Sequence, residues 1–442
     1  MRTNTYYLVS LGCAKNTVDS TSMAELLNRN GYTQVTRPSQ ARFIIVNTCG
    51  FIQSARQESI QILKELARKK RSGQKLIAAG CMTELYQQMI TEQVPGLDGL
   101  LGTRRWMDIV NIVEGLRSNN LPVPSYNVPD VSVLSHGEKG VPRIAKQGGS
   151  AYIKIADGCH RSCAFCTIPL IKGSTVSRPQ AAILEEAIML QESGVKEIIL
   201  IAQDTTAYGH DRGEKEGLAM LLESLVTTVP RIPWIRIMYA YPGCVTDRLI
   251  SVMAEHPQIL PYLDMPLQHA HPDILRLMKR PANVKWVHQT LDKMRKKIHQ
   301  LAIRTTFIVG YPGETEKEFQ ELLNFVREIQ FDRIGAFPFS FEPGTASEHL
   351  GDPVPEETKQ ERLERLMLTQ QEISLERNRS LIGKILPVLV EGCDNNISVG
   401  RSYRDAPEID GLVFIEGKLP IGEIVNIRVI GALPHDLIGN PV

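Results

Sequence analysis

Three cysteines lie within eight residues of one another, in the pattern Cys159-x-x-x-Cys163-x-x-Cys166. Thiolates are soft ligands that select iron–sulfur clusters, zinc or copper(I). A closed structural zinc site needs four ligands, and the neighbouring His160, which points differently, is the one residue nearby that could complete it. Three thiolates on a four-iron cluster would instead leave one iron open for a substrate or cofactor. The pattern therefore favours a reactive iron–sulfur cluster, with zinc as the alternative.

A second set of cysteines consists of Cys13, Cys49 and Cys81, each of which ends an apolar run that is typical of a strand. Side chains at equivalent strand ends of a parallel sheet meet in one crevice, even when they are distant in the sequence. We therefore expect these cysteines to form a second set of three ligands. The alternative is that they are three independent core residues. A second cluster held in this way could also keep an open iron.

The composition is that of an ordinary globular protein of several domains. The chain has 442 residues, of which 43% are hydrophobic and 22% charged, and its formal net charge is +1. This balance argues against binding nucleic acid by bulk charge alone. No apolar run approaches the length of a membrane span, and the N-terminus lacks the pattern of a signal peptide. We therefore expect a cytoplasmic protein with no membrane association, in which the cysteines are not a disulfide framework.

The N-terminal segment predicts an α/β domain that would position the second set of cysteines. Apolar runs at 6–13, 41–49 and 75–81 alternate with stretches of helical spacing. Strand–helix–strand order implies right-handed crossovers and a parallel sheet with helices on its faces. Residues 116–144 are rich in Asn, Pro, Ser and Gly, so we predict a linker there. We place the N-terminal cluster domain at residues 4–118.

The rest of the chain predicts a partial barrel followed by a small β-barrel. The strands that we expect in the first of these are 151–158, 197–204, 234–241, 261–268, 304–313 and 332–340. Six strand–helix units are too few for a full eight-fold barrel. A partial parallel (β/α)6 barrel fits at residues 145–375, with its site at the C-terminal strand ends. Residues 354–381 predict one long charged helix, and the short apolar runs after it predict a small antiparallel barrel at 377–442.

The first cysteine motif carries a family resemblance. DGCHRSCAFCTIP, residues 157–169, closely resembles the signature of the radical S-adenosylmethionine (SAM) superfamily. In that superfamily the three thiolates hold a 4Fe–4S cluster whose open iron binds SAM, and one-electron transfer cleaves SAM to a 5′-deoxyadenosyl radical. The resemblance implies the same cofactors here and agrees with the expected six-unit barrel. Lys172 stands where an arginine is commoner, and it would clamp an anion more weakly.

The same resemblance suggests which residues contact SAM. The candidates are Phe165, Gln203, Asp204, Gly310, Gly313 and Glu314. The aromatic residue is at the position that usually contacts the adenine, and a plain core aromatic is the alternative. The other five lie at strand ends of the expected barrel, where radical-SAM enzymes approach SAM. A tight turn explains the two glycines equally well, and a local loop role is the alternative for Gln203 and Asp204.

Two three-cysteine sets followed by a small β-barrel resemble the methylthiotransferase family, over about residues 4–440. Members share an N-terminal cluster domain, a radical-SAM domain and a C-terminal TRAM barrel. The resemblance implies two 4Fe–4S clusters and two uses of SAM. One SAM supplies a methyl group that ends on a sulfur at the second cluster, and another supplies the radical that abstracts a substrate hydrogen. The resemblance also implies an electron donor as a partner, and nothing demands more than a monomer.

Several segments resemble one branch of this family, which modifies the β-carbon of an aspartate in a small-subunit ribosomal protein, the twelfth by the usual count. They are GCAKNTVDS (12–20), NTCGFIQSA (47–55), AQDTTAYG (202–209), YLDMPLQHA (262–270) and RDAPEIDG (404–411). The substrate would be that protein, free or in the assembled subunit. The alternative branch modifies an adenosine next to the tRNA anticodon. A non-catalytic iron–sulfur electron carrier is an alternative from another class, which the barrel-sized second segment disfavours.

The charge of the C-terminal segment gives a check that is independent of the resemblance. Residues 384–442 contain five basic and eight acidic side chains. A barrel that grips tRNA should be basic, whereas an acidic barrel favours a basic protein partner such as a ribosomal protein. We predict a docking patch at Asp405, Glu408 and Asp410, with an ordinary solvated face as the alternative.

Overall fold

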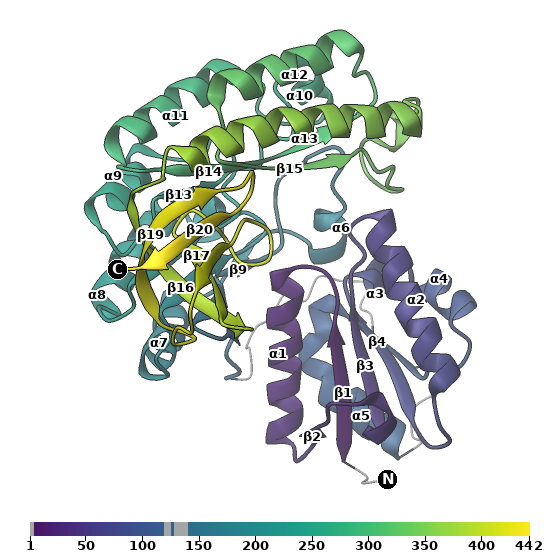
Figure 1. Ribbon diagram of the computed structural model, residues 1–442. Helices are drawn as coiled ribbons and strands as arrows, with labels where there is room; N and C mark the ends of the chain where they lie inside the picture. Colours follow the sequence, from purple (N-terminus) through teal and green to yellow (C-terminus); the bar gives the residue numbers. More distant parts are fainter. Residues whose placement is uncertain (1–3, 119–124, 128–139) are drawn as a thin grey trace. The chain divides into compact units, whose positions relative to one another are not determined.

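The structure is a computed structural model that describes residues 4–118, 125–127 and 140–442. Its contacts divide the chain into two units, which Figure 1 shows in the colours of the sequence. The first contains residues 1–145, 156–176 and 342–345, and the second contains residues 146–155, 177–341 and 346–442. The predicted domain boundaries, which follow chain order, stay predictions. In the part of the chain that the structure describes, no helix combines the length and apolar character that a membrane crossing requires.

A six-stranded parallel sheet forms the centre of the first unit. Its strands in spatial order are β2 (Thr33–Gln34), β1 (Thr5–Ser10), β3 (Phe43–Thr48), β4 (Lys75–Gly80), β5 (Gly99–Gly102) and β6 (Ser125–Asn127). The central strand β3 is buried along its whole length, as expected for a parallel strand that is covered on both faces. The three strands predicted in this segment are confirmed as β1, β3 and β4.

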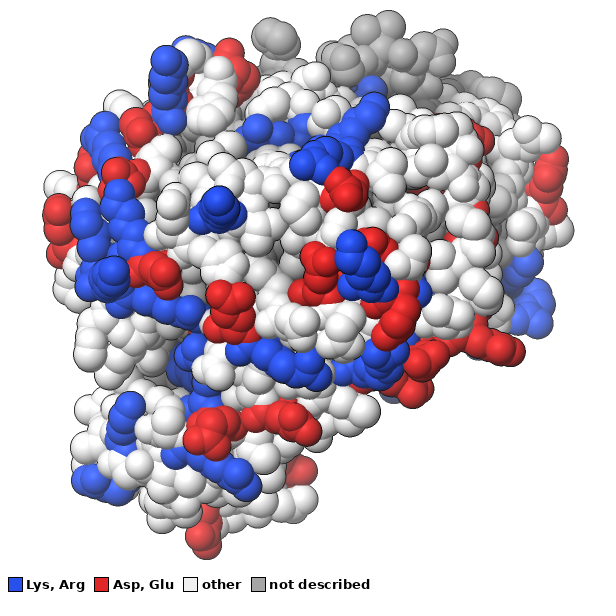
Figure 2. Space-filling model, turned by 90° about the horizontal axis from the view of Figure 1, so that it is seen from above, with Lys and Arg blue, Asp and Glu red and all other residues white. Residues whose placement is uncertain are grey.

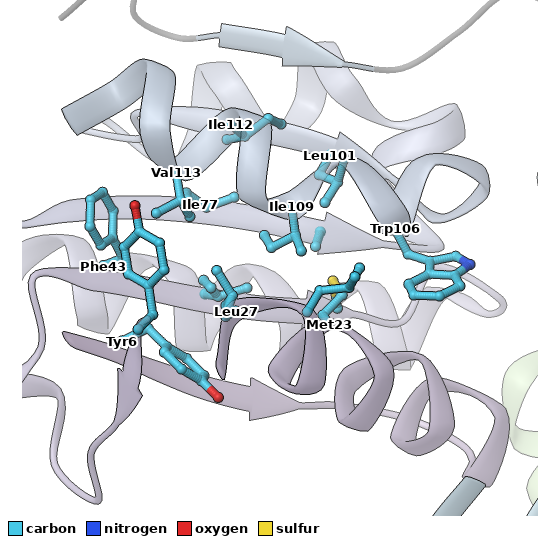
Figure 3. Close-up of a cluster of buried hydrophobic side chains, with 14 of the residues drawn as sticks. Tyr6, Met23, Leu27, Phe43, Ile77, Leu101, Trp106, Ile109, Ile112 and Val113 are labelled. Atoms are coloured by element: carbon cyan, nitrogen blue, oxygen red, sulfur yellow. The ribbon is translucent and has the colours of Figure 1, made fainter. Parts of the chain in front are cut away.

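Helices cover the two faces of this sheet and bury a core on each. The helices of this unit are α1 (Ala14–Arg29), α2 (Gln53–Lys69), α3 (Met82–Leu85), α4 (Gln87–Gln93), α5 (Ile109–Arg117) and α6 (Ile168–Lys172). Successive residues of β3 point to opposite faces, so Phe43 belongs to one core and Ile44 to the other. Figure 3 shows the first core, where Leu27 of α1 and Ile109 of α5 pack over the sheet.

The linker predicted at 116–144 is wrong in the parts that the structure describes. Residues Ser125–Asn127 form β6, which pairs in parallel with β5. Val141 belongs to the first core, and Arg143 is 1% exposed. A composition rich in Asn, Pro, Ser and Gly indicates irregular backbone, but it does not prevent single side chains from packing against a sheet. Residues 119–124 and 128–139 lie outside the described part.

Six parallel strands alternate with helices in the second unit. They are β8 (Ser150–Lys154), β11 (Glu197–Ile201), β12 (Trp234–Ile237), β13 (Tyr262–Asp264), β14 (Ala302–Val309) and β15 (Arg333–Pro338). The first three form one sheet, which β7 (Ile144–Gln147) extends, and the last three form another. The helices are α7 (Gln180–Glu192), α8 (Gly217–Thr228), α9 (Asp247–Glu255), α10 (Pro272–Leu277), α11 (Val284–Lys297) and α12 (Glu316–Ile329). The expected partial (β/α)6 barrel is confirmed.

A long helix and a closed β-barrel complete the second unit. The helix is α13 (Glu356–Arg379), which confirms the charged helix predicted there. The barrel has the order β16 (Ile385–Asp394), β17 (Ile397–Ser402), β18 (Val413–Glu416), β20 (Leu437–Pro441) and β19 (Ile424–Ala432). Its strand pairs are antiparallel, except that β18 and β20 are parallel. The predicted fold class is therefore confirmed.

Candidate active site

The three cysteines of the N-terminal set follow neighbouring strands. Strands β1, β3 and β4 are adjacent and parallel; Cys49 and Cys81 come directly after β3 and β4, and Cys13 lies three residues after the last residue of β1. A Cβ on Gly12 would lie 2.9 Å from the Cys49 Sγ, and the φ of +89° at Gly12 also favours glycine. The structure thus brings these thiols together, and their role as cluster ligands stays a prediction.

Burial opposes deprotonation of two thiols of this set, Cys49 and Cys81. It raises the pKa of Cys49 and raises the pKa of Cys81 to about 12. The positive charge of Lys172 acts in the other direction on the pKa of Cys81, whereas the neighbouring thiols Cys13 and Cys49 add to the rise. Conversion of these two buried thiols to thiolates therefore needs a further positive partner, which a bound metal cluster supplies.

Two polar side chains that the sequence analysis missed hold these strand ends. The Cys81 thiol donates to Asn16 Oδ1 at 3.4 Å, and the Asn16 amide donates to two carbonyls at the ends of β1 and β3, at 2.8 and 3.1 Å. Ser59 on α2 accepts from the Cys49 N–H and donates to the Cys49 carbonyl, both at 3.1 Å. One feature of the sequence could have indicated the role of Asn16. Helix α1 begins directly after Cys13, and Asn16 lies in its first turn.

The first set of cysteines lies on the loop between β9 (Ala156–Asp157) and α6, in the same unit. It consists of the partly exposed thiols of Cys159, Cys163 and Cys166, which form no disulfide among the described residues. The loop closes on itself, because the Cys159 N–H donates to the Gly173 carbonyl at 2.9 Å. A Cβ on Gly158 would lie 2.1 Å from the Ser174 carbonyl oxygen, so this close approach requires glycine. Phe165 is half-buried in this loop, and its contact with SAM stays a prediction.

Lys172 is buried at the end of α6, and its ammonium group meets carboxylates of the protein itself. It donates to Asp19 Oδ2 at 3.0 Å and to Thr103 Oγ1 at 2.6 Å, and Asp157 Oδ1 lies 3.6 Å away. The anions that Lys172 binds are thus carboxylates of the protein itself. Because Asp19 lies on the helix after Cys13, the ion pair ties the segment that follows the first cysteine set to the helix that follows Cys13 of the second set.

The two donor sets suit iron–sulfur clusters, which are held by cysteine thiolates. Within residues 4–118, 125–127 and 140–442, no three Cys, His, Asp or Glu side chains converge closely enough to hold a single metal ion. A four-iron cluster is larger than one ion, and its thiolates lie correspondingly further apart. Three thiols are the donors that such a cluster uses, and a cluster at each set stays a prediction.

The other residues predicted to contact SAM lie in the second unit. Asp204 follows β11, is buried, and accepts from the Thr206 hydroxyl. The adjacent Gln203 Oε1 is buried with no hydrogen-bond partner among the described residues. Gly310 and Gly313 form the turn after β14, with φ values of +70° and +92°. A buried amide oxygen that lacks a partner can be satisfied by a ligand, and the contacts of all four residues with SAM stay predictions.

Glu314 is fully buried, and protein groups surround both of its carboxylate oxygens. Its Oε1 accepts from the Gly310 N–H at 2.8 Å and from the Arg362 guanidinium at 2.7 Å. Its Oε2 lies 3.0 Å from His269 Nε2. Glu314 therefore shapes the glycine turn from inside the protein, and a direct contact with SAM stays a prediction.

The prediction of an exposed acidic patch on the C-terminal barrel is wrong, because two of its three residues are buried. The side chains of Asp405 and Asp410 are 2% and 1% exposed. Asp405 pairs with Arg333 at 2.6 Å and Asp410 with Arg304 at 3.2 Å, and both arginines belong to strands of the partial barrel. Of the three predicted residues, Glu408 alone is exposed. A count of charges along the sequence does not show which acidic side chains face buried arginines.

The chain matches three known sequence families. Residues 5–102 match the Uncharacterized protein family UPF0004, residues 153–326 the Radical SAM superfamily and residues 382–442 the TRAM domain. Among solved structures, it is similar to the radical S-adenosylmethionine methyltransferase TsrM from Kitasatospora setae with cobalamin and a [4Fe-4S] cluster bound. The TM-score is 0.58 at 12% identity, over 78% of this chain and 74% of that chain. This similarity shows a shared fold.

Curated relatives are similar to this chain over nearly the whole length. The ribosomal protein uS12 methylthiotransferase RimO of Roseiflexus sp. (strain RS-1) is 44% identical, over 99% of this chain and 97% of that protein. The proteins of the same name from Herpetosiphon aurantiacus and Chloroflexus aurantiacus are 45% and 46% identical, over 99% and 98% of this chain and 100% and 99% of those proteins. With its radical-SAM fold and its TRAM barrel, the chain therefore belongs to the radical-SAM methylthiotransferase family, in which it groups with the RimO proteins.

Proposed function

We propose that this transferase adds a methylthio group to the β-carbon of an aspartate in ribosomal protein uS12. The observation that carries the proposal is the pair of three-thiol sets in one unit, in a chain whose relatives are named for uS12 methylthiotransfer. An unactivated C–H bond cannot be deprotonated at neutral pH, so this chemistry needs a radical. Two donor sets suit a reaction that has to both generate a radical and deliver a sulfur group.

The proposed cofactors are SAM and two 4Fe–4S clusters. The first set, Cys159, Cys163 and Cys166, would hold the cluster that binds SAM, and the second set, Cys13, Cys49 and Cys81, would hold the other. When bound, these groups supply a radical from one SAM and a sulfur that carries the methyl group of another. The chain's own contribution is positioning: Asn16 and Ser59 fix the strand ends of the second set, and Glu314 fixes the turn at Gly310.

The proposed partner is a basic ribosomal protein, and the exposed charges of the C-terminal barrel support this. Its exposed acidic residues are Glu391, Asp394, Glu408, Glu416 and Glu423, and its exposed basic residues are Lys384, Lys418 and Arg428. The excess of negative charge disfavours RNA and favours a basic protein. We further propose that the enzyme acts in the cytoplasm as a monomer and receives electrons from a separate donor.

A substrate competition tests the proposal. The anaerobically reconstituted enzyme would receive reductant, SAM and sulfide, together with small ribosomal subunits and bulk tRNA. Mass spectrometry of the digested protein and nucleosides should show a methylthio group on a uS12 aspartate. A methylthio group on an adenosine would keep the family and overturn the substrate.

Cysteine variants test the division of labour between the two sets. Replacing the three cysteines of the first set by Ala should abolish SAM cleavage and leave about half of the iron. Replacing the three cysteines of the second set should preserve SAM cleavage and stop methylthio transfer, since the two steps would use different clusters. Full transfer by the second triple variant would show that one cluster suffices.

A further inference from the structure

A strongly basic edge lies on the first unit, at the end of the sheet opposite to the cysteines. It is formed by three segments, residues 33–42, 66–76 and 94–99, which together contain seven basic residues and one acidic residue, Asp98. We call this surface the basic edge; its basic residues are Arg37, Arg42, Arg68, Lys69, Lys70, Arg71 and Lys75.

The side chain of Gln74 holds two of these segments together. It is 4% exposed, and its Nε2 donates to the carbonyls of Pro38 at 2.8 Å and Ala41 at 2.6 Å. Its Oε1 accepts from the Arg71 N–H at 2.8 Å. Arg42 lies across the same turn, because a Cβ on Gly73 would be 2.5 Å from an Arg42 guanidinium nitrogen. Residues that are about 30 positions apart are thereby gathered on one fixed surface.

Most of the positive charge on the basic edge has no carboxylate partner in the described part of the chain. Lys70 and Lys75 share Asp98, at 2.6 and 3.3 Å. The remaining five basic residues form no ion pair with any residue that the structure describes. Four of the five are exposed, and Arg42 is half-buried. By contrast, acidic and basic side chains are interspersed on the face seen in Figure 2.

The position of the basic edge separates it from the proposed chemistry. Strands β3 and β4 are parallel and begin here, at Phe43 and Lys75, whereas Cys49 and Cys81 follow their other ends (Figure 1). Six residues of strand span about 20 Å. A surface at this distance can hold a large partner without entering the reaction. An electron donor, by contrast, has to approach the clusters.

We propose that the basic edge binds the phosphate backbone of RNA, so that the enzyme engages uS12 in the assembled small ribosomal subunit rather than as a free protein. This inference rests on the proposed function. Unpaired guanidinium and ammonium groups bind phosphates through charge and release counterions. The three segments contain no aromatic residue, so we expect backbone contact without base stacking. The acidic C-terminal barrel is unsuited to this task.

A charge-reversal variant tests the inference. The enzyme that carries Arg68→Glu, Lys69→Glu and Arg71→Glu would be compared with wild type for binding to small ribosomal subunits and to their isolated RNA, over a range of KCl concentrations. We expect at least about tenfold weaker binding to both, and a salt slope that is smaller by about two to three units, because each lost phosphate contact removes about 0.9 of a unit. Reductive SAM cleavage without substrate should be unchanged.

The matched control reverses three exposed lysines of the second unit, Lys285→Glu, Lys296→Glu and Lys297→Glu on α11, which changes the net charge equally. It should bind subunits with nearly the wild-type salt slope. Equal losses in the two variants, or wild-type binding by the first, would overturn the inference. A third outcome would also overturn it. In that outcome the first variant binds RNA normally and cleaves SAM normally with dithionite, but cleaves SAM slowly with an acidic electron-donor protein. If wild type binds the RNA tightly but modifies neither free uS12 nor uS12 in the assembled subunit, the proposed function is wrong. RNA binding by the basic edge would then still hold.

Discussion

Asp19 meets two buried cations, Lys172 and Arg143, in the first unit. In the Lys172→Met variant Asp19 and Asp157 would share Arg143, so that one buried cation would face two carboxylates. Removing one partner of a buried ion pair is costly because negative charge stays buried with less compensation. We expect the free energy of unfolding to fall by about 3 kcal/mol, measured by urea denaturation.

A control for this variant is Lys64→Met, in which the lost ammonium made one exposed hydrogen bond, to Gln93. It should change stability by less than about 0.5 kcal/mol, as surface substitutions usually do. Equal effects of the two substitutions would mean that Lys172 is not held by the internal carboxylates.

At the scale of elements, side chains of α13 contact and stabilise the turn after β14. Arg362 donates to Glu314, which in turn accepts from the Gly310 N–H, and the Lys359 stem occupies the space where a Cβ on Gly310 would lie. The Arg362→Met variant should lose about 3 kcal/mol of stability, because the buried Glu314 charge loses its cation. It should also bind SAM more weakly, since this turn is a predicted SAM contact. Chemical denaturation and calorimetric titration with SAM would measure the two effects.

The same helix offers a matched control in Arg365, one turn further along α13. Arg365 pairs with the exposed Glu316 at 2.7 Å, and its side chain is 34% exposed against 7% for Arg362. Exposed pairs contribute little, so Arg365→Met should cost less than about 1 kcal/mol and leave SAM affinity unchanged. A loss of SAM affinity in both variants would assign the effect to the helix as a whole.

At the scale of the whole second unit, buried charges fix the C-terminal barrel on the partial barrel. Glu197 accepts from Arg236 and from Arg401, each at 2.7 Å. Burial alone would raise the pKa of Glu197, but the two arginines hold it down, from the ordinary 4.5 to about 2. A carboxyl whose pKa is lower in the folded state stabilises the fold above its unfolded pKa. That stabilisation, about 3 kcal/mol, is lost as the pH falls from 4.5 towards 2.

The Glu197→Gln variant should therefore be less stable than wild type at pH 7, and the difference should shrink as the pH falls below 4.5. Urea denaturation at several pH values would measure this. Glu423→Gln, which removes an exposed pair with Lys196, serves as the control and should follow the wild-type pH dependence. A constant difference between wild type and Glu197→Gln across this range would contradict the lowered pKa.

The sequence by itself determined three parallel strands of the N-terminal sheet, the six-unit barrel and the positions of Cys13, Cys49 and Cys81 at strand ends. These follow from local periodicity and from the rule that parallel strands end at one edge. Tertiary structure alone decided which charges are exposed. Asp405 and Asp410 are buried because arginines more than 70 residues away meet them, and Arg37 and Arg71 share a surface because Gln74 joins their loops. Such long-range pairings leave no periodic pattern in the chain, so only the folded contacts show them.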